Sequence, residues 1–118
     1  MDYAVTVYLI RHARTKSNVE HRYLGWTDEE ILPNQDLPVI SRCGKVAFGS
    51  DLKRCRQTAK LYFPSAAYYS DAGFRESNFG EFEGKTYDDL KEIPQYRKWI
   101  DDPTHLAPPA GETLVAVS

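Results

Sequence analysis

The first apolar run of the chain extends from Ala4 to Ile10 with almost no polar interruption. Its β-branched and aromatic residues are typical of a central strand that is covered on both faces. Arg11, His12 and Ala13 follow at once and begin a loop. Because ligands of open α/β sheets bind at the carboxyl ends of the strands, the pattern predicts an imidazole and a guanidinium at a binding edge.

Short strands and helices alternate along the rest of the chain, with prolines marking the connector Leu32–Pro38. The predicted elements are a helix over Lys16–Tyr23, a strand over Val46–Gly49, a helix capped by Ser50 and ending at Phe63, a strand over Ala66–Tyr69, helices over Tyr87–Ile93 and Tyr96–Ile100, and a resumed apolar pattern over Glu112–Val117. Thr86 and Asp89 are expected to form the N-terminal cap of the helix over Tyr87–Ile93.

The helix after Ser50 carries apolar residues at helical spacing: Leu52, Cys55, Ala59 and Tyr62. Arg54 lies in its first turn, where the helix dipole disfavours positive charge. This placement indicates that Arg54 binds an anion. An ordinary solvent-exposed arginine explains the segment equally well when it is considered alone.

Composition narrows the class of protein. The 118 residues suffice for one domain, and 42% hydrophobic with 27% charged residues is ordinary for a globular protein. A net charge of -2 does not support nucleic-acid binding. The first apolar run is too short for a signal peptide or a membrane span, so we expect a cytoplasmic protein with no membrane partner. Cys43 and Cys55 lack the spacing of a redox or phosphatase motif and are interpreted as structural thiols.

Several motifs together resemble the histidine phosphatase superfamily, which is the phosphoglycerate mutase-like family. In order, they are Arg11-His12, Asn18, Gly25-Trp26-Thr27-Asp28, Ser50-Asp51-Leu52-Lys53-Arg54, Gln57-Thr58-Ala59, Arg75-Glu76 and Phe79-Gly80-Glu81-Phe82-Glu83-Gly84. The resemblance extends from Val5 to about Gly111. It implies a single domain over residues 1–118 with a three-layer α/β/α fold and a mostly parallel central sheet.

The resemblance also implies roles for individual residues. His12 matches the nucleophile that becomes a phosphohistidine, and Glu76 matches the proton donor. Arg11, Arg54 and Asn18 match residues that bind the phosphate. A carboxyl in the role of Glu76 works best with a raised pKa. No metal and no cofactor are implied.

Other residues are assigned less central roles. Thr15 and Gly25 are expected at the pocket rim, with Trp26 as a rim residue or a packed aromatic. His21 and His105 are expected at the surface or in contact with substrate rather than in catalysis. Phe74 and Phe79 are expected to surround Glu76 with an apolar pocket.

The chain also departs from the family pattern. The family's second catalytic histidine follows a late strand, and no counterpart precedes Ser118, so we expect a domain truncated at its C-terminal end. The segment between Asp28 and Ser50 is short and proline-bearing where the family has an amphipathic helix. A missing helix would expose an apolar face, which favours a homo-oligomer or another partner. Ala13 replaces the usual glycine after Arg-His.

Three functions remain open from the sequence. The first is a phosphomonoesterase that hydrolyses a small phosphorylated metabolite through a phosphohistidine, with α-ribazole 5'-phosphate as one candidate. The second is a catalytically impaired phosphate-binding module. The third is a phosphotransferase of the phosphoglycerate mutase type, which the absence of a long insertion between Ser50 and Glu76 disfavours.

Overall fold

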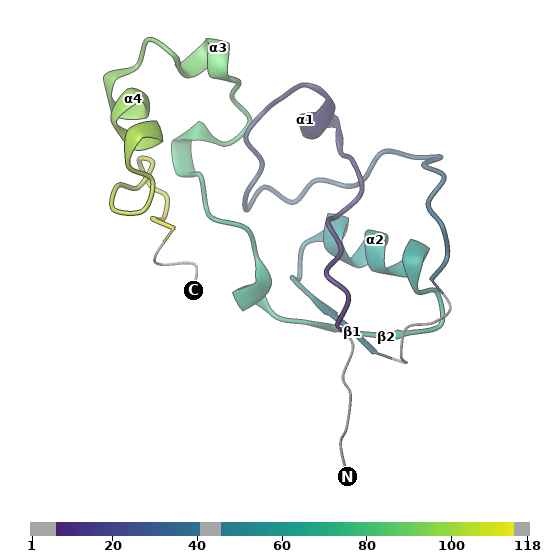
Figure 1. Ribbon diagram of the computed structural model, residues 1–118. Coiled ribbons are helices and arrows are strands. Elements are labelled where there is room, and N and C mark those ends of the chain that lie inside the picture. The colour runs from purple at the N-terminus through teal and green to yellow at the C-terminus, as the bar shows by residue number, and fades with distance from the viewer. Residues whose placement is uncertain (1–6, 41–45, 115–118) are drawn as a thin grey trace.

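One end of the fold is built on a parallel pair of strands joined by a helix (Figure 1). The structure is a computed structural model that describes residues 7–40 and 46–114. Strand β1 (Val46–Gly49) pairs with β2 (Ala67–Ser70) from Val46 opposite Ala67 to Gly49 opposite Ser70. Helix α2 (Lys53–Tyr62) connects them. The strand predicted at 46–49 is confirmed, and the one predicted at 66–69 lies one residue later.

The start of α2 differs from the expectation. Its N-cap is Leu52 rather than Ser50, and Leu52 offers no side-chain cap. Ser50 Oγ accepts a hydrogen bond from the Leu52 N–H at 3.2 Å, so it stabilises the turn that precedes the helix. The Lys53 N–H donates to Asp28 Oδ1 at 2.8 Å. The carboxylate of Asp28, from a distant loop, therefore accepts a hydrogen bond from the helix terminus that Ser50 was expected to cap.

The most deeply buried side chains of α2 are polar. Arg54 and Thr58 are almost fully buried, whereas Cys55 and Ala59 of the predicted apolar stripe are only partly buried. Thr58 Oγ1 donates to the Arg54 carbonyl at 2.7 Å and accepts from the Ala13 N–H at 2.8 Å. Through Thr58, this polar face of α2 therefore binds the backbone of the residue that follows His12.

The predicted first strand does not form over the described residues 7–10. These residues have no regular structure and are exposed, with Leu9 at 93% relative exposure. The start of the predicted strand, from Ala4, lies outside the described residues. A strand requires a hydrogen-bonded neighbour, and the sheet in the described part of the chain consists of β1 and β2 alone. The prediction of a buried strand over 7–10 is therefore wrong for this structure.

Helix α1 (Lys16–Val19) is shorter than the helix predicted over residues 16–23. It begins with a capping box formed by Thr15 and Asn18. His21 adopts a positive φ of 56°, a left-handed conformation that cannot continue a helix. The chain consequently turns away before Tyr23.

A second group of elements packs at the other end of the molecule (Figure 1). It contains the short helix η2 (Gly80–Phe82), α3 (Tyr87–Leu90) and α4 (Pro94–Asp101), whereas η1 (Ala72–Phe74) precedes it. The buried cluster between them consists of Phe82, Leu90, Tyr96 and Trp99, with Tyr23, Phe79 and Ile93 against it. The predicted capping box of Thr86 and Asp89 is confirmed at α3.

Two helix boundaries in this group differ from the predictions. Helix α3 ends at Leu90 instead of Ile93, and α4 begins at Pro94 instead of Tyr96. Proline is favoured in the first turn of a helix because the N–H it lacks has no partner there. Pro94 therefore starts the helix that it was expected to interrupt.

The parallel sheet and its connecting helix confirm an α/β fold. The described residues 29–40 between Asp28 and β1 contain no helix, as the sequence led us to expect. Of the apolar pattern predicted over residues 112–117, the positions from 115 onward lie outside the described residues. None of the helices in the described ranges is long and apolar enough to cross a membrane.

Candidate functional site

His12 lies partly buried where the N-terminal segment meets α2, and its ring is oriented by its own backbone. Nδ1 lies 2.7 Å from the Ala13 carbonyl oxygen. Because a carbonyl can only accept, Nδ1 carries the proton and Nε2 keeps its lone pair when the ring is neutral.

The surroundings of His12 favour that neutral ring. Burial lowers the pKa of His12, and the charges of Arg54 and Arg11 lower it further, against the opposing effects of the Ala13 hydrogen bond and Glu76. The net shift is downward from the ordinary value of about 6.5. The imidazole is therefore suited to nucleophilic attack near neutral pH.

Arg54 is held near His12 by the backbone of a neighbouring loop. Only 2% of the residue is exposed, and its Nη1 donates to the Thr27 carbonyl at 2.8 Å. Its Nη2 donates to the Gly25 carbonyl. Nε is buried without a hydrogen-bond partner among the described residues. A guanidinium has five N–H donors, so this arrangement fixes the group while leaving donors unused.

Glu76 lies in the exposed segment after Arg75, close enough for its charge to act on His12. Its Oε1 accepts from the Ser77 N–H at 2.8 Å, and its carbonyl accepts from Trp26 Nε1 at 3.0 Å. The predicted apolar pocket around it is not formed. Phe74 is 61% exposed, and the ring of Phe79 packs in the aromatic cluster against Tyr23 and Trp99.

The remaining predicted residues occupy different environments. Arg11 is exposed, and its charge acts on His12. Asn18 Oδ1 accepts from the Thr15 N–H at 2.9 Å, which leaves its Nδ2 group outside the capping box. Thr15 is fully buried and caps α1. Gly25 is also buried, and a Cβ there would lie 2.1 Å from the Ser77 carbonyl oxygen.

Two histidines lie at the surface. His21 is exposed, and His105 is exposed with its Nδ1 2.9 Å from Asp102 Oδ1. Within residues 7–40 and 46–114, no three His, Cys, Asp or Glu side chains come together in a group that could hold a metal ion.

Sequence reasoning missed three interactions that shape this region. Asp51 forms a two-pronged ion pair with Arg75, at 2.6 and 2.7 Å. The Arg75 guanidinium lies over the Trp26 ring, 4.9 Å from its centroid. Glu83 accepts five hydrogen bonds, four of them from the loop of residues 25–27. Glu83 lies in the motif over residues 79–84 that resembles the family, but it was not predicted as a site residue, and nothing in the sequence indicated its partners.

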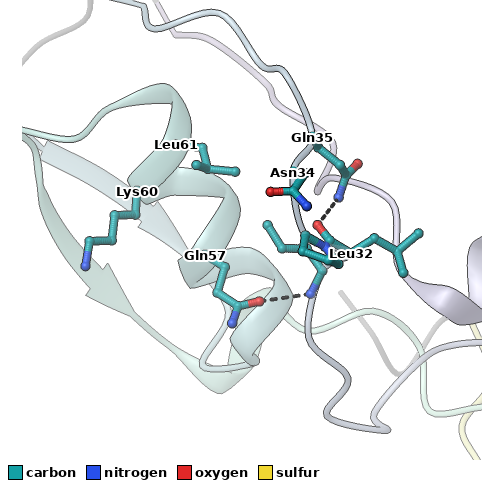
Figure 2. A pocket seen from close by; sticks show the side chains of 8 residues that line it. Leu32, Asn34, Gln35, Gln57, Lys60 and Leu61 are labelled. Atoms are coloured by element: carbon teal, nitrogen blue, oxygen red, sulfur yellow. Dashed lines mark hydrogen bonds between the residues drawn. The ribbon is translucent and has the colours of Figure 1, made fainter.

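One cavity lies apart from these residues. A pocket of about 390 Å³ lies between the loop after Glu30 and helix α2, and Figure 2 shows its lining side chains. Gln57 Oε1 accepts from the Ile31 N–H at 2.9 Å, and Gln35 Nε2 donates to the Leu32 carbonyl at 2.8 Å. None of the residues predicted for the site lines this pocket, so the chemistry of His12 places the candidate site elsewhere.

Comparison with known proteins agrees with the fold and the motifs. The model of the histidine phosphatase superfamily (branch 1) matches residues 39–118, a range that begins after Arg11 and His12. A protein of Escherichia coli O1:K1 named probable phosphoglycerate mutase GpmB is 28% identical over 123 residues, which covers 95% of this chain and 57% of that protein.

Solved structures show the same likeness. The TTHB049 protein of Thermus thermophilus is 32% identical with a TM-score of 0.70, over 92% of this chain and 64% of that one. The alpha-ribazole phosphatase of Shigella flexneri is 24% identical with a TM-score of 0.74, over 92% of this chain and 59% of that one, and shows the fold alone.

The parallel sheet and the matched family model define an α/β protein. The chain belongs to the histidine phosphatase superfamily. It spans somewhat more than half the length of the curated relative that it matches.

Proposed function

We propose that this protein is a phosphomonoesterase that forms a phosphohistidine at His12. The observation that supports this function most strongly is the state of that side chain. Its Nδ1 is bound to the Ala13 carbonyl, its pKa is lowered by burial and by two arginines, and Nε2 is left as the nucleophilic atom. The same arginine charges attract a phosphate dianion.

In the proposed reaction, His12 Nε2 attacks phosphorus and the bond from phosphorus to the ester oxygen breaks. Glu76 donates its proton to the leaving alkoxide. In the second half, Glu76 accepts a proton from a water molecule, the water oxygen attacks phosphorus, and the phosphorus–nitrogen bond breaks. The products are an alcohol and inorganic phosphate. Arg11, Arg54 and the Nδ2 group of Asn18 would bind the phosphoryl oxygens.

The substrate class that we propose is a small phosphorylated metabolite. The structural likeness to the alpha-ribazole phosphatase of Shigella flexneri makes α-ribazole 5'-phosphate one compound to test. The relative named as a probable phosphoglycerate mutase makes phosphoryl transfer between metabolites the competing reaction. Release of inorganic phosphate distinguishes hydrolysis from exchange with a bisphosphoglycerate.

The test is to incubate the purified chain with an aryl phosphate and to measure phosphate release and protein-bound phosphate. We expect an acid-labile, base-stable phosphohistidine that His12→Ala abolishes. His105→Ala replaces an exposed histidine and serves as the matched control, with activity close to that of the unmodified chain. A folded chain that never releases phosphate at high protein concentration would contradict the proposal.

A phosphate-binding protein without turnover is the second candidate. It is favoured by the exposure of Glu76, the proposed proton donor, around which the expected apolar pocket is not formed. Such a protein would bind inorganic phosphate and would show no phosphohistidine.

A further inference from the structure

The Arg54 guanidinium depends on the backbone of one short loop for its position. The two carbonyls that accept from it belong to Gly25 and Thr27. These residues lie in a segment without regular secondary structure, where the backbone has no helix or strand ladder to hold it. Some other interaction must therefore fix the direction of the two carbonyls.

The carboxylate of Glu83 binds the N–H groups of the same loop. Oε1 accepts from the Gly25 N–H at 2.9 Å and from Thr27, at 3.2 Å from its N–H and 2.9 Å from its Oγ1. Oε2 accepts from the Trp26 N–H at 2.8 Å and from the Phe79 N–H at 3.1 Å. Hydrogen bonds from three consecutive residues leave the loop little freedom to rotate.

Peptide geometry links Glu83 to Arg54. The Trp26 N–H and the Gly25 carbonyl belong to one planar trans peptide group, in which the two point in opposite directions. A carboxylate on the N–H side and a guanidinium on the carbonyl side polarise that group in the same sense. Fixing the Trp26 N–H therefore fixes the carbonyl that accepts from Arg54 Nη2.

We propose that Glu83 is a positioning residue that sets the Arg54 guanidinium for phosphate by clamping the backbone of residues 25–27. The inference rests on the proposed function only in assigning Arg54 to the phosphate. Glu83 does not itself contact substrate in this scheme. Its negative charge faces the loop amides, and the positive charge of Arg54 acts on His12.

The isosteric variant Glu83→Gln tests the clamp. A glutamine has one acceptor oxygen, and its NH₂ group would face N–H donors, so several of the five hydrogen bonds are lost. We expect the affinity for inorganic phosphate, measured by NMR titration, to fall about tenfold or more, as for loss of a charge-assisted hydrogen bond. Glu81→Gln, at an exposed position of the short helix η2 that Glu83 follows, is the matched control and should leave the affinity unchanged.

A double-mutant cycle separates positioning from a general loss of structure. If Glu83 acts through Arg54, then Glu83→Gln should cost little further affinity in an Arg54→Met background. An unchanged cost in that background would overturn the inference. Thr27→Val removes a single donor to Glu83 and keeps both carbonyls, so it should weaken phosphate binding slightly even if Glu83→Gln does not fold. Full affinity in Thr27→Val together with full affinity in a folded Glu83→Gln would also overturn it.

The same experiment distinguishes this inference from the proposed function. If phosphate binds and the cycle shows coupling while His12 is never phosphorylated, the enzyme proposal fails and the positioning role of Glu83 stands. If His12 is phosphorylated but Glu83→Gln binds phosphate as tightly as the unmodified chain, the inference fails and the enzyme proposal stands. If phosphate does not bind at all, Arg54 is not a phosphate ligand and the inference fails.

Discussion

At the scale of single residues, two titrating side chains determine how the site responds to pH. His12 and Glu83 both have lowered pKa values, for different reasons. Desolvation and neighbouring arginines keep the imidazole neutral, whereas backbone N–H groups keep the carboxylate charged. Near neutral pH the site thus contains an uncharged imidazole beside the positive charges of two arginines.

The first prediction concerns the pH dependence of turnover. If His12 is the nucleophile that we propose, its neutral ring is the reactive form. Because its pKa is lowered, kcat/KM for an aryl phosphate should stay high below pH 6.5 before falling in acid. Arg11→Gln removes a charge that lowers this pKa, so the acidic limb should move to higher pH. Arg14→Gln, also exposed and two residues after His12, is the matched control. An acidic limb at or above pH 6.5 in the unmodified chain would contradict the prediction.

The second prediction concerns acid stability. Burial raises the pKa of Glu83, but hydrogen bonds from Gly25, Trp26 and Thr27 outweigh it, so the folded-state value lies below the unfolded one. The contribution of the Glu83 charge is complete above the unfolded value of about 4.3 and is lost as the pH falls through the folded pKa. The difference in unfolding free energy between the unmodified chain and Glu83→Gln should therefore shrink from pH 7 to pH 3.

Urea denaturation at the two pH values measures this difference. The same comparison with Glu81→Gln removes the general effect of one carboxylate fewer. A difference for Glu83→Gln that stays constant with pH would show that the folded protein does not stabilise the charge.

At the scale of elements, an aromatic cluster supports the residues that carry Glu83. Phe79 precedes η2 and Phe82 ends it, and both contact Trp99 of α4, with ring centroids 5.9 and 5.5 Å apart. The buried Tyr96 hydroxyl pairs with that of Tyr23 at 2.7 Å, just before the loop of residues 25–27. Packing around α4 therefore supports both Glu83 and the loop of residues 25–27 that its carboxylate binds.

The third prediction follows from that packing. Trp99 is 8% exposed, and Trp99→Ala should lower the free energy of unfolding by about 3–5 kcal/mol, because it removes a large buried ring and leaves a cavity. It should also weaken phosphate binding, since Phe79 and Phe82 lose their neighbour. Ile100→Ala, at the exposed next position, should change stability by about 0.5 kcal/mol or less. Chemical denaturation measures the free energy of unfolding of both variants. Equal losses of stability in the two variants would contradict the role of the aromatic cluster.

At the scale of the whole molecule, one face of the sheet has no cover among the described residues. Val46, Phe48 and Tyr69 are 50%, 67% and 55% exposed, and the Phe48 and Tyr69 rings stack with centroids 5.7 Å apart. Parallel sheets are normally buried on both faces. An apolar surface of this kind favours association with another copy of the chain.

The fourth prediction is that the purified chain self-associates through this face. Light scattering should show a mean mass that rises with protein concentration, and Phe48→Lys should reduce that rise. Phe74→Lys introduces the same charge at another exposed phenylalanine outside the sheet and is the control. If both variants reduce association equally, the sheet face is not the contact surface.

The sequence predicted best those elements whose signals are local. Val46–Gly49 formed the expected strand, and Thr86 with Asp89 formed the expected cap, because β-propensity and capping depend on a few adjacent residues. The strand over residues 7–10 failed because a strand requires a partner, which sequence periodicity does not provide. The prediction that Ser50 caps α2 was wrong, because Asp28, far away in the sequence, accepts the hydrogen bond from the N-terminus of that helix.

By itself, the sequence determined the family and the candidate nucleophile, because the Arg11-His12 pair and the motifs around Arg54 and Glu76 are contiguous residue patterns. Only the tertiary structure decided how those residues are held. The carboxylate of Glu83 reaches a loop 58 positions earlier in the chain, and that loop in turn holds Arg54. Such contacts arise from packing between distant segments, so no local pattern encodes them.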